Sequence, residues 1–151
     1  MKPPALDPAT VAPRTGTAYP EPFRKPCEQR EKRTLGNELG LTHYGVNLTR
    51  LAPGAWSAQR HWHTQQDEFV YVVAGELALV TDEGEQLLRP GMAAGFPAGT
   101  PNGHHLVNRS NAPAVYLEVG DRTIGDEVHY PDVDLFVSAD MRYRHKSGEP
   151  W

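Results

Sequence analysis

The alternation of apolar and polar residues along the chain predicts a series of short β-strands. In the segment Leu41–Leu51, apolar side chains at Tyr44, Val46 and Leu48 alternate with polar ones. This is the period-two pattern of a strand with one buried face. A turn that contains proline and glycine, Ala52–Ala55, follows directly.

Further segments have the apolar, β-branched or aromatic character of strands, and turns rich in glycine or proline separate them. Turn signals that recur every 8–12 residues or so are typical of an all-β sandwich or barrel. No stretch offers three clean helical turns, and one or two more strands are expected among the apolar residues between positions 128 and 137. The segments are Glu68–Val73, Leu77–Thr81, Leu87–Leu88, Met92–Phe96, His104–Asn108 and Ala114–Val119.

Seven of the 14 prolines lie in Met1–Pro26, a stretch with few large apolar residues. We expect an extended arm here, either a disordered tail or an arm that lies across a partner subunit, since proline lowers the entropy lost on ordering. The predicted domain division is therefore a proline-rich arm over residues 1–30 and a barrel with a C-terminal extension over residues 31–151. The polar segment Glu28–Arg33 leads into the folded part, and no chemistry is assigned to it.

The last segment, Asp121–Trp151, carries an acidic part followed by a basic end. A charge run of this sort usually forms a solvated face, and we predict one here, with a dimer contact as the alternative. The charged residues in question are Asp126, Glu127, Asp132, Asp134, Asp140, Arg142, Arg144 and Lys146.

Charge and composition narrow the class of partner. The formal net charge is -4 at pH 7, and no basic stripe is present, so a small molecule is expected as partner and nucleic acid is not. No apolar run approaches the roughly 18 residues of a membrane span, and the start of the chain lacks the apolar core of a secretory signal. We therefore expect a cytoplasmic protein without membrane contact. The single Cys27 excludes an internal disulfide and any site that needs several thiolates.

Histidines are then the candidate metal ligands. His61 and His63 are two residues apart, so on a strand both imidazoles point to one side and Trp62 points to the other. Glu68 follows five residues later, after a short polar bend, and its carboxylate can supply a third ligand. Histidine and carboxylate together suit one divalent transition metal ion, namely iron, manganese, nickel, cobalt or zinc.

The spacing of glycines, histidines and glutamate around this pair resembles the first motif of the cupin superfamily. The matching residues are Gly54, His61, His63, Glu68 and Gly75. Six residues, one more than in the family pattern, separate Gly54 from His61.

A second segment, some 40 residues later, resembles the second cupin motif. The matching residues are Gly91, Pro97, Gly99, His104 and Asn108. Four residues instead of two separate Gly99 from His104. Both departures lie in turn segments, where insertions are tolerated.

The resemblance implies a metal site as well as a fold. Carried over position by position, it makes His61, His63, Glu68 and His104 the ligands of one divalent transition metal ion. His105 is the alternative to His104, because a shift of register by one residue would exchange the faces of these two neighbours.

The fold implied by the resemblance is the jelly-roll cupin barrel, a double-stranded β-helix, over about Leu41–Val119. The implied function is a metal-dependent enzyme for a small oxygen-bearing metabolite. It would be an isomerase or lyase with the metal as Lewis acid, or a dioxygenase with the metal as dioxygen-activating centre. The alternative is a non-catalytic, metal-dependent cupin that binds a small molecule or sugar.

The closing segment, Glu118–Leu135, also resembles a group of small bacterial cupins, some of which carry the label sugar-phosphate isomerase. No catalytic residue is assigned besides the metal ligands, and a homodimer is the expected oligomer. An apolar cavity wall is expected from Tyr44, Val46, Leu48, Val70, Val72 and Phe96, with Tyr71, Arg50 or His43 as polar contacts if their side chains point inward. No cluster of arginines or lysines is recognised near the motifs, so the sequence does not demand a strongly phosphorylated substrate. The candidates for orienting the imidazoles are Gln59, Gln65, Gln66 and Asn108.

Overall fold

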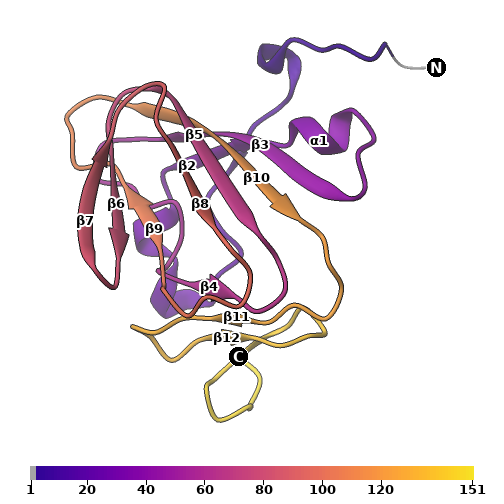
Figure 1. Cartoon of the computed structure of the whole chain (residues 1–151), viewed down its shortest axis with the longest axis vertical. Coiled ribbons are helices and arrows are strands. Elements are labelled where there is room, and N and C mark those ends of the chain that lie inside the picture. Colours follow the sequence, from indigo (N-terminus) through magenta and orange to yellow (C-terminus); the bar gives the residue numbers. More distant parts are fainter. Residues whose placement is uncertain (1–2) are drawn as a thin grey trace.

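Two β-sheets face each other across the interior of the computed structural model, which describes residues 3–151 (Figure 1). Residues 1 and 2, the start of the predicted arm, lie outside the described residues. The larger sheet has the strand order β1-β2-β3-β10-β5-β8. Its strands are β1 (Arg14–Thr15), β2 (Arg30–Arg33), β3 (Tyr44–Leu51), β10 (Ala114–Asp121), β5 (Glu68–Ala74) and β8 (Ala93–Phe96).

The facing sheet has the order β7-β6-β9, and a third, four-stranded sheet covers the lower end of the barrel in Figure 1. The facing sheet consists of β7 (Gly84–Leu88), β6 (Leu77–Thr81) and β9 (His105–Val107). The third sheet consists of β13 (Tyr143–Arg144), β12 (Phe136–Val137), β11 (Val128–His129) and β4 (Trp62–His63) in that order.

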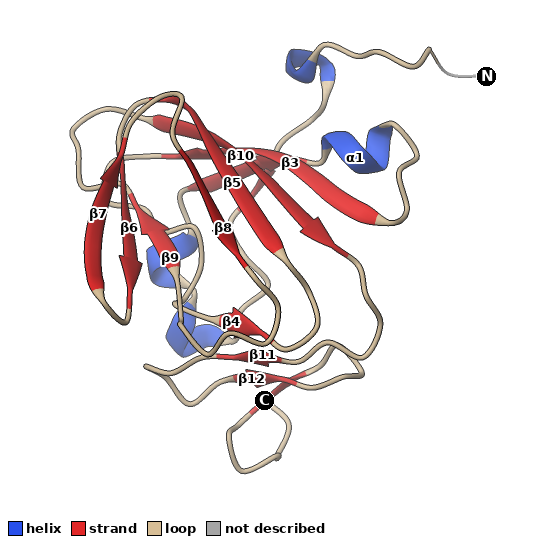
Figure 2. Cartoon of the chain, in the orientation of Figure 1, coloured by secondary structure: helices blue, strands red, loops and turns tan. Residues whose placement is uncertain are grey.

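Helical structure is limited to single turns, as Figure 2 shows by the small blue segments. Three prolines stand in the three 3-10 turns of the N-terminal segment, where their fixed φ suits the first positions. Within residues 3–151, no helix is long and apolar enough to cross a lipid bilayer. The helical turns are η1 (Pro8–Thr10), η2 (Glu21–Phe23), η3 (Lys25–Cys27) and α1 (Leu35–Glu38).

The prediction of an all-β barrel is confirmed. Each segment predicted as a strand between residues 41 and 119 contains one, and the C-terminal part adds β11, β12 and β13. The pattern did not predict β1 and β2. Both are rich in charge and pair at the edge of the large sheet, so they lack the apolar alternation that marks a half-buried strand.

The core lies between the two facing sheets. Leu51 and Tyr116 of the large sheet and Leu77 of the facing sheet are fully buried there. Burying large apolar side chains between two sheets supplies the main driving force for this packing. The core residues are Leu51, Ala55, Val70, Val72, Leu77, Leu79, Leu88, Leu106, Ala114 and Tyr116.

The inner face of β3 carries the opposite set of residues from the predicted one. Thr49 pairs with Tyr116 of β10, and both side chains are fully buried, whereas Tyr44 of the other parity is 43% exposed. The short helix α1 covers the outer face, where a Cβ atom at Gly36 would lie 3.0 Å from the backbone nitrogen of Val46. The alternation is thus confirmed, and the parity of Thr49 faces inward while α1 packs on Val46 on the outer face.

The proline-rich segment packs against the chain's own C-terminal part. The Tyr19 ring meets the Tyr130 ring edge-on with centroids 5.8 Å apart, and its hydroxyl accepts a hydrogen bond from the Gln59 N–H at 3.2 Å. Neither of the two expected alternatives, a tail or an arm across a partner, includes this packing. The boundary at residue 30 stays a prediction. The buried residues of this second cluster are Tyr19, Phe23, Cys27, Tyr130, Leu135 and Val137.

Replacing Phe23 by alanine should lower the free energy of unfolding by about 3 kcal/mol, because truncating a buried aromatic side chain leaves a cavity. Phe23 is 8% exposed, and its ring centroid lies 5.3 Å from that of Trp151. Urea unfolding followed by tryptophan fluorescence measures the change. Ile124→Ala is the control, with no change expected, because Ile124 is 96% exposed. Equal stability of both variants would mean that the N-terminal segment is not packed in solution.

Candidate metal centre

Two of the sequence-predicted ligands, His61 and His104, are paired backbone to backbone. They form an isolated antiparallel bridge in which the His61 N–H donates to the His104 carbonyl oxygen at 3.1 Å, and the reverse bond measures 2.9 Å. Residues directly opposite each other in an antiparallel pair project their side chains to the same face. The two imidazole rings therefore lie side by side, with centroids 4.7 Å apart.

The Glu68 carboxylate is the point on which the imidazole nitrogens converge. Glu68 begins β5 and pairs with Gly120 of β10. Its Oε2 lies 2.5 Å from Nε2 of His104, and its Oε1 lies 3.1 Å from Nε2 of His63. Nε2 of His61 is 3.4 Å from Oε1. The structure thus brings all four sequence-predicted residues together.

Within this group, three residues are closest. His61, Glu68 and His104 each offer one ligand atom within 4.8 Å of the others. His63 reaches the same carboxylate from β4, at the edge of the four-stranded sheet, and stands outside that tightest set. The centre is therefore built by elements from two sheets and one isolated bridge.

The Nδ1 atoms of His61 and His63 each form a hydrogen bond to an acceptor oxygen. Nδ1 of His61 lies 2.8 Å from the backbone oxygen of Gln59, and Nδ1 of His63 lies 2.6 Å from Oδ2 of Asp126. A carbonyl oxygen and an ionised carboxylate only accept hydrogen bonds, so each Nδ1 carries the hydrogen. In the neutral ring, each Nε2 then directs a lone pair toward Glu68.

Asp126 departs from the predicted solvated acidic face, on which Asp132, Asp134 and Asp140 are exposed. It is 3% exposed, and besides His63 it accepts a hydrogen bond from the Gln65 backbone N–H at 2.8 Å. The pairing of Val128 in β11 with His63 in β4 brings this carboxylate against the ring. Sequence reasoning named glutamines for orienting the imidazoles and missed Asp126, because only the strand pairing makes it a neighbour of His63.

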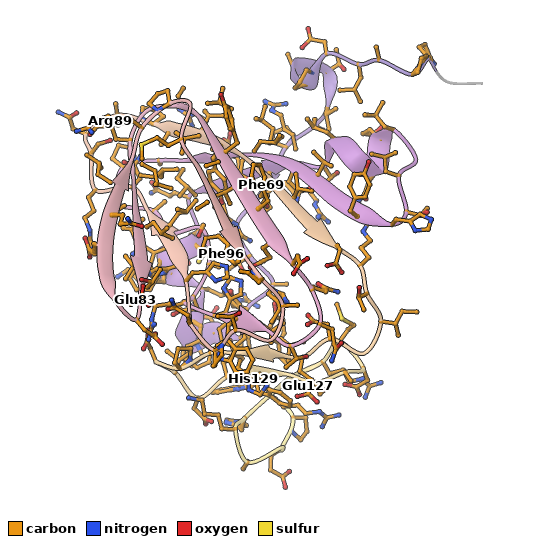
Figure 3. The ribbon with its side chains drawn as sticks, in the orientation of Figure 1. Phe69, Glu83, Arg89, Phe96, Glu127 and His129 are labelled. Carbon is orange, nitrogen blue, oxygen red and sulfur yellow. The ribbon has the colours of Figure 1, made fainter. Side chains whose placement is uncertain are left out.

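The neighbours His104 and His105 face opposite sides. Nδ1 of His105 donates to the Ala58 carbonyl oxygen at 2.8 Å, and its ring packs edge-on against Trp56. The His104 ring stacks in parallel on Phe96, with centroids 3.5 Å apart. Phe96, labelled in Figure 3, packs against the core between the sheets and lines the cavity. His104, and not His105, is therefore the residue beside the Glu68 carboxylate.

Charges within the centre shift its pKa values. Burial alone raises the pKa of Glu68, but the imidazoles of His61, His104 and His63 outweigh it and hold that pKa well below its usual range. Burial lowers the pKa of His63, yet the carboxylates of Glu68 and Asp126 together raise it to about 9. Burial lowers the pKa of His104. At neutral pH, Glu68 is therefore ionised, and the His63 ring carries protons on both nitrogens and is positively charged.

This donor set fits a divalent cation. The Nε2 atoms of His61, His63 and His104 each lie 2.5–3.4 Å from an oxygen of the Glu68 carboxylate. Imidazole nitrogen and carboxylate oxygen are ligands that divalent transition metals accept.

The centre lies in the wall of a cavity of about 760 Å³, a volume typical of small-molecule sites. Val70 and Phe96 line it as expected, but Arg30, Lys32 and Glu118 line it too. The polar contacts of the cavity are therefore not the expected ones, because Tyr71, Arg50 and His43 do not line it. Four of the expected residues do not line the cavity: Tyr44, Val46, Leu48 and Val72.

The polar lining was missed for identifiable reasons. Arg30 and Lys32 share one face of β2, whose sequence Arg-Glu-Lys-Arg contains no apolar residue to signal a strand. Glu118 has the same parity on β10 as the fully buried Tyr116. This parity is the one sequence signal that could have placed Glu118 inside the barrel.

Comparison with known proteins agrees with this architecture. The family model of the cupin domain matches residues 47–120. No curated protein matches the sequence. A solved structure of a sugar phosphate isomerase of the cupin superfamily from Silicibacter pomeroyi is 44% identical, with a TM-score of 0.92. That similarity covers 98% of this chain and 96% of the other.

Two further solved structures are similar. A protein of Acidithiobacillus ferrooxidans, named for a proposed sugar phosphate isomerase activity, is 31% identical over 77% of this chain and 70% of its own, with a TM-score of 0.68. The polyketide cyclase RemF of Streptomyces resistomycificus is 22% identical over 80% of this chain and 79% of its own, with a TM-score of 0.65, and shares the fold. From these matches and the barrel itself, it follows that the chain belongs to the cupin superfamily.

Proposed function

We propose that this cupin is a metal-dependent isomerase or lyase for a small oxygen-bearing metabolite, with His61, His63, Glu68 and His104 as ligands of one divalent transition metal ion. The observation that carries the proposal is the convergence of three imidazole Nε2 atoms on one ionised carboxylate in a cavity wall. Three histidines and one carboxylate leave coordination positions open for water or substrate, as catalytic sites require.

The chain's own residues would hold and tune the ion. Asp126 and the Gln59 carbonyl oxygen fix the ring hydrogens of His63 and His61, which keeps both Nε2 atoms free to bind. Phe96 holds the plane of the His104 ring by stacking on it. A bound divalent ion polarises a carbonyl oxygen or lowers the pKa of a bound hydroxyl group, which is the chemistry that isomerisation and elimination need.

Two observations favour isomerisation over dioxygen chemistry. The two cupins that are 44% and 31% identical are named for sugar phosphate isomerase activity. The cavity wall also carries Lys32 and Glu118, side chains able to hold hydroxyl groups and carry protons. A sugar phosphate is therefore the substrate class that we propose first. A homodimer and a cytoplasmic location stay predictions.

Protein purified without a histidine tag should contain about one divalent transition metal ion per chain, measured by elemental analysis, because the four donors form one site. His61→Ala and His104→Ala should each lower the content to background. His105→Ala should largely preserve it, since that ring faces Ala58.

Thermal melting of the metal-free variants controls for misfolding. A wild-type protein without metal above background would contradict the proposal. Metal retained in His104→Ala but lost in His105→Ala would mean that the wrong histidine is assigned.

Metal binding should release about one proton per zinc ion at pH 7, because His63 is protonated below its pKa of about 9 and must lose that proton to bind. The affinity for zinc should accordingly rise about tenfold per pH unit from pH 7 and level off near pH 9. Calorimetry in buffers of different ionisation enthalpy measures the released protons.

Asp126→Asn is the matched variant for this measurement. It removes one of the charges that raise the pKa of His63, so its affinity should level off at a lower pH. Zinc binding at pH 7 without proton release would speak against His63 as a ligand.

Metal-loaded protein should interconvert aldose and ketose phosphates, and proton NMR in D₂O detects the reaction as deuterium exchange next to the carbonyl group. Glu68→Gln should reduce the exchange to background, because it removes the one anionic ligand of the proposed site. Oxygen uptake by the iron-loaded protein with catechols or diketones would indicate dioxygenase activity instead. Tight ligand binding without either reaction would identify a binding protein.

A further inference from the structure

A second polar cluster, outside both cupin motifs, lies in the wall of the same cavity. It consists of Lys32 on β2, Asn47 and Thr49 on β3, and Glu118 on β10. The Lys32 ammonium lies 2.6 Å from Oε1 of Glu118, the Asn47 amide donates to Oε1 at 3.1 Å, and the Thr49 hydroxyl donates to Oε1 at 3.2 Å. All three donors thus meet one carboxylate oxygen.

The other oxygen of Glu118 keeps its capacity to accept. Among the described residues, no hydrogen bond to Oε2 of Glu118 is formed. The side chains of Glu118 and Lys32 are 23% and 24% exposed, although both point inward from the large sheet. An ion pair held in a fixed position, with one free acceptor oxygen reachable from a cavity, is suited to bind a ligand group.

Strand pairing places this cluster one step from the metal centre. Glu68 pairs with Gly120 of β10, and Glu118 is the next residue of β10 on the same face, opposite Val70. Diagonal neighbours across an antiparallel pair are about 7–8 Å apart. Gly120 and its partner Gly45 on β3 also line the cavity and contribute no side chain. A ligand can therefore extend along this floor from Glu68 to Glu118.

The cavity also carries arginines that form no ion pair within residues 3–151, and Arg30 is the one on the same strand as Lys32. The Arg30 guanidinium donates to the backbone carbonyl oxygens of Ser57 and Gly16, which are neutral, and forms no ion pair within residues 3–151. Lys32 and Glu118 balance each other in charge. The cavity as a whole is lined by Arg14, Arg30, Lys32 and Arg122 against Glu68, Glu118 and Asp121, and this excess of positive charge favours a ligand that has an anionic group.

We propose that this wall is a hydroxyl-binding subsite, in which Oε2 of Glu118 accepts from a ligand hydroxyl while Lys32 and Asn47 donate to neighbouring ligand oxygens. A hydroxyl group both donates and accepts, so it requires an acceptor and donors side by side, as this cluster provides. The ligand class is a polyhydroxylated molecule with a phosphate or carboxylate group. The inference rests on the proposed function only in one respect: the end of the ligand near Glu68 is taken to bind the proposed metal ion.

Calorimetry with zinc-loaded protein tests the subsite, with D-ribose 5-phosphate, 6-phosphogluconate, gluconate, D-ribose and inorganic phosphate as probes. At least one of the two sugar phosphates or gluconate should bind at least tenfold more tightly than inorganic phosphate, because only they offer hydroxyl groups as well as an anion. Comparing the affinity of gluconate with those of the two sugar phosphates shows whether a carboxylate can serve as the anionic group in place of a phosphate. Inorganic phosphate binding as tightly as all of them, or no binding of any sugar probe, would overturn the proposal.

Substitutions assign the binding to the wall. Glu118→Gln and Lys32→Met should each weaken the best sugar probe at least tenfold and leave zinc content unchanged, since neither residue contacts the metal centre. Glu31→Gln, on the same strand with the opposite parity, is the matched control and should bind like wild type. Wild-type affinity in Glu118→Gln would reduce the ion pair to a structural role and overturn the proposal.

The same measurements separate this inference from the proposed function. Sugar binding that depends on Glu118 in a protein without metal would preserve the subsite and overturn the metal-dependent enzyme. Zinc binding together with sugar binding that ignores Glu118 would do the reverse. Thermal melting of Glu118→Gln and Lys32→Met shows whether each variant folds. If either single variant does not fold, the double variant Lys32→Met/Glu118→Gln replaces it, because it leaves no unpaired charge behind. The double variant should also lose affinity for the sugar probe.

Discussion

The convergence of three imidazole rings on the Glu68 carboxylate is the constraint on which the rest of the structure depends. Buried carboxylates are stable only when positive or hydrogen-bonding groups compensate for lost water. Here the histidines provide that compensation, so Glu68 stays ionised inside the barrel. The bridge between His61 and His104 holds the backbone of two of these residues together by a pair of hydrogen bonds.

The position of the centre divides the interior of the barrel into two parts. Away from Glu68, large apolar residues such as Leu51 and Leu77 fill the space between the facing sheets. Near it, Gly45 and Gly120 leave space, and polar residues line the cavity instead of packing it. The large sheet thus contributes residues to both the packed core and the open polar cavity.

The terminal segments complete the end of the barrel near the histidines. Tyr19 and Phe23 from the proline-rich segment pack on Tyr130 and Leu135, and the His61 ring lies 5.9 Å from the Tyr130 ring. The second hydrophobic cluster therefore supports the metal centre from behind. This also gives the prolines a structural reason, because they form short 3-10 turns that let an otherwise irregular segment pack.

The sequence by itself indicated which segments form strands, since alternation and turn residues are local properties, and the resemblance of its two motifs to cupins indicated the candidate ligands His61, His63, Glu68 and His104. It could not decide which parity of β3 faces inward, because both faces of that strand carry residues that pack against something. Nor could it place Asp126 beside the candidate ligands, or Arg30 and Lys32 in the cavity, whereas the parity that Glu118 shares with Tyr116 was a signal for Glu118 alone. Asp126, Arg30 and Lys32 gain their meaning only from pairing between segments that are distant in sequence, and a charged side chain in an isolated sequence looks the same whether it faces solvent or a cavity.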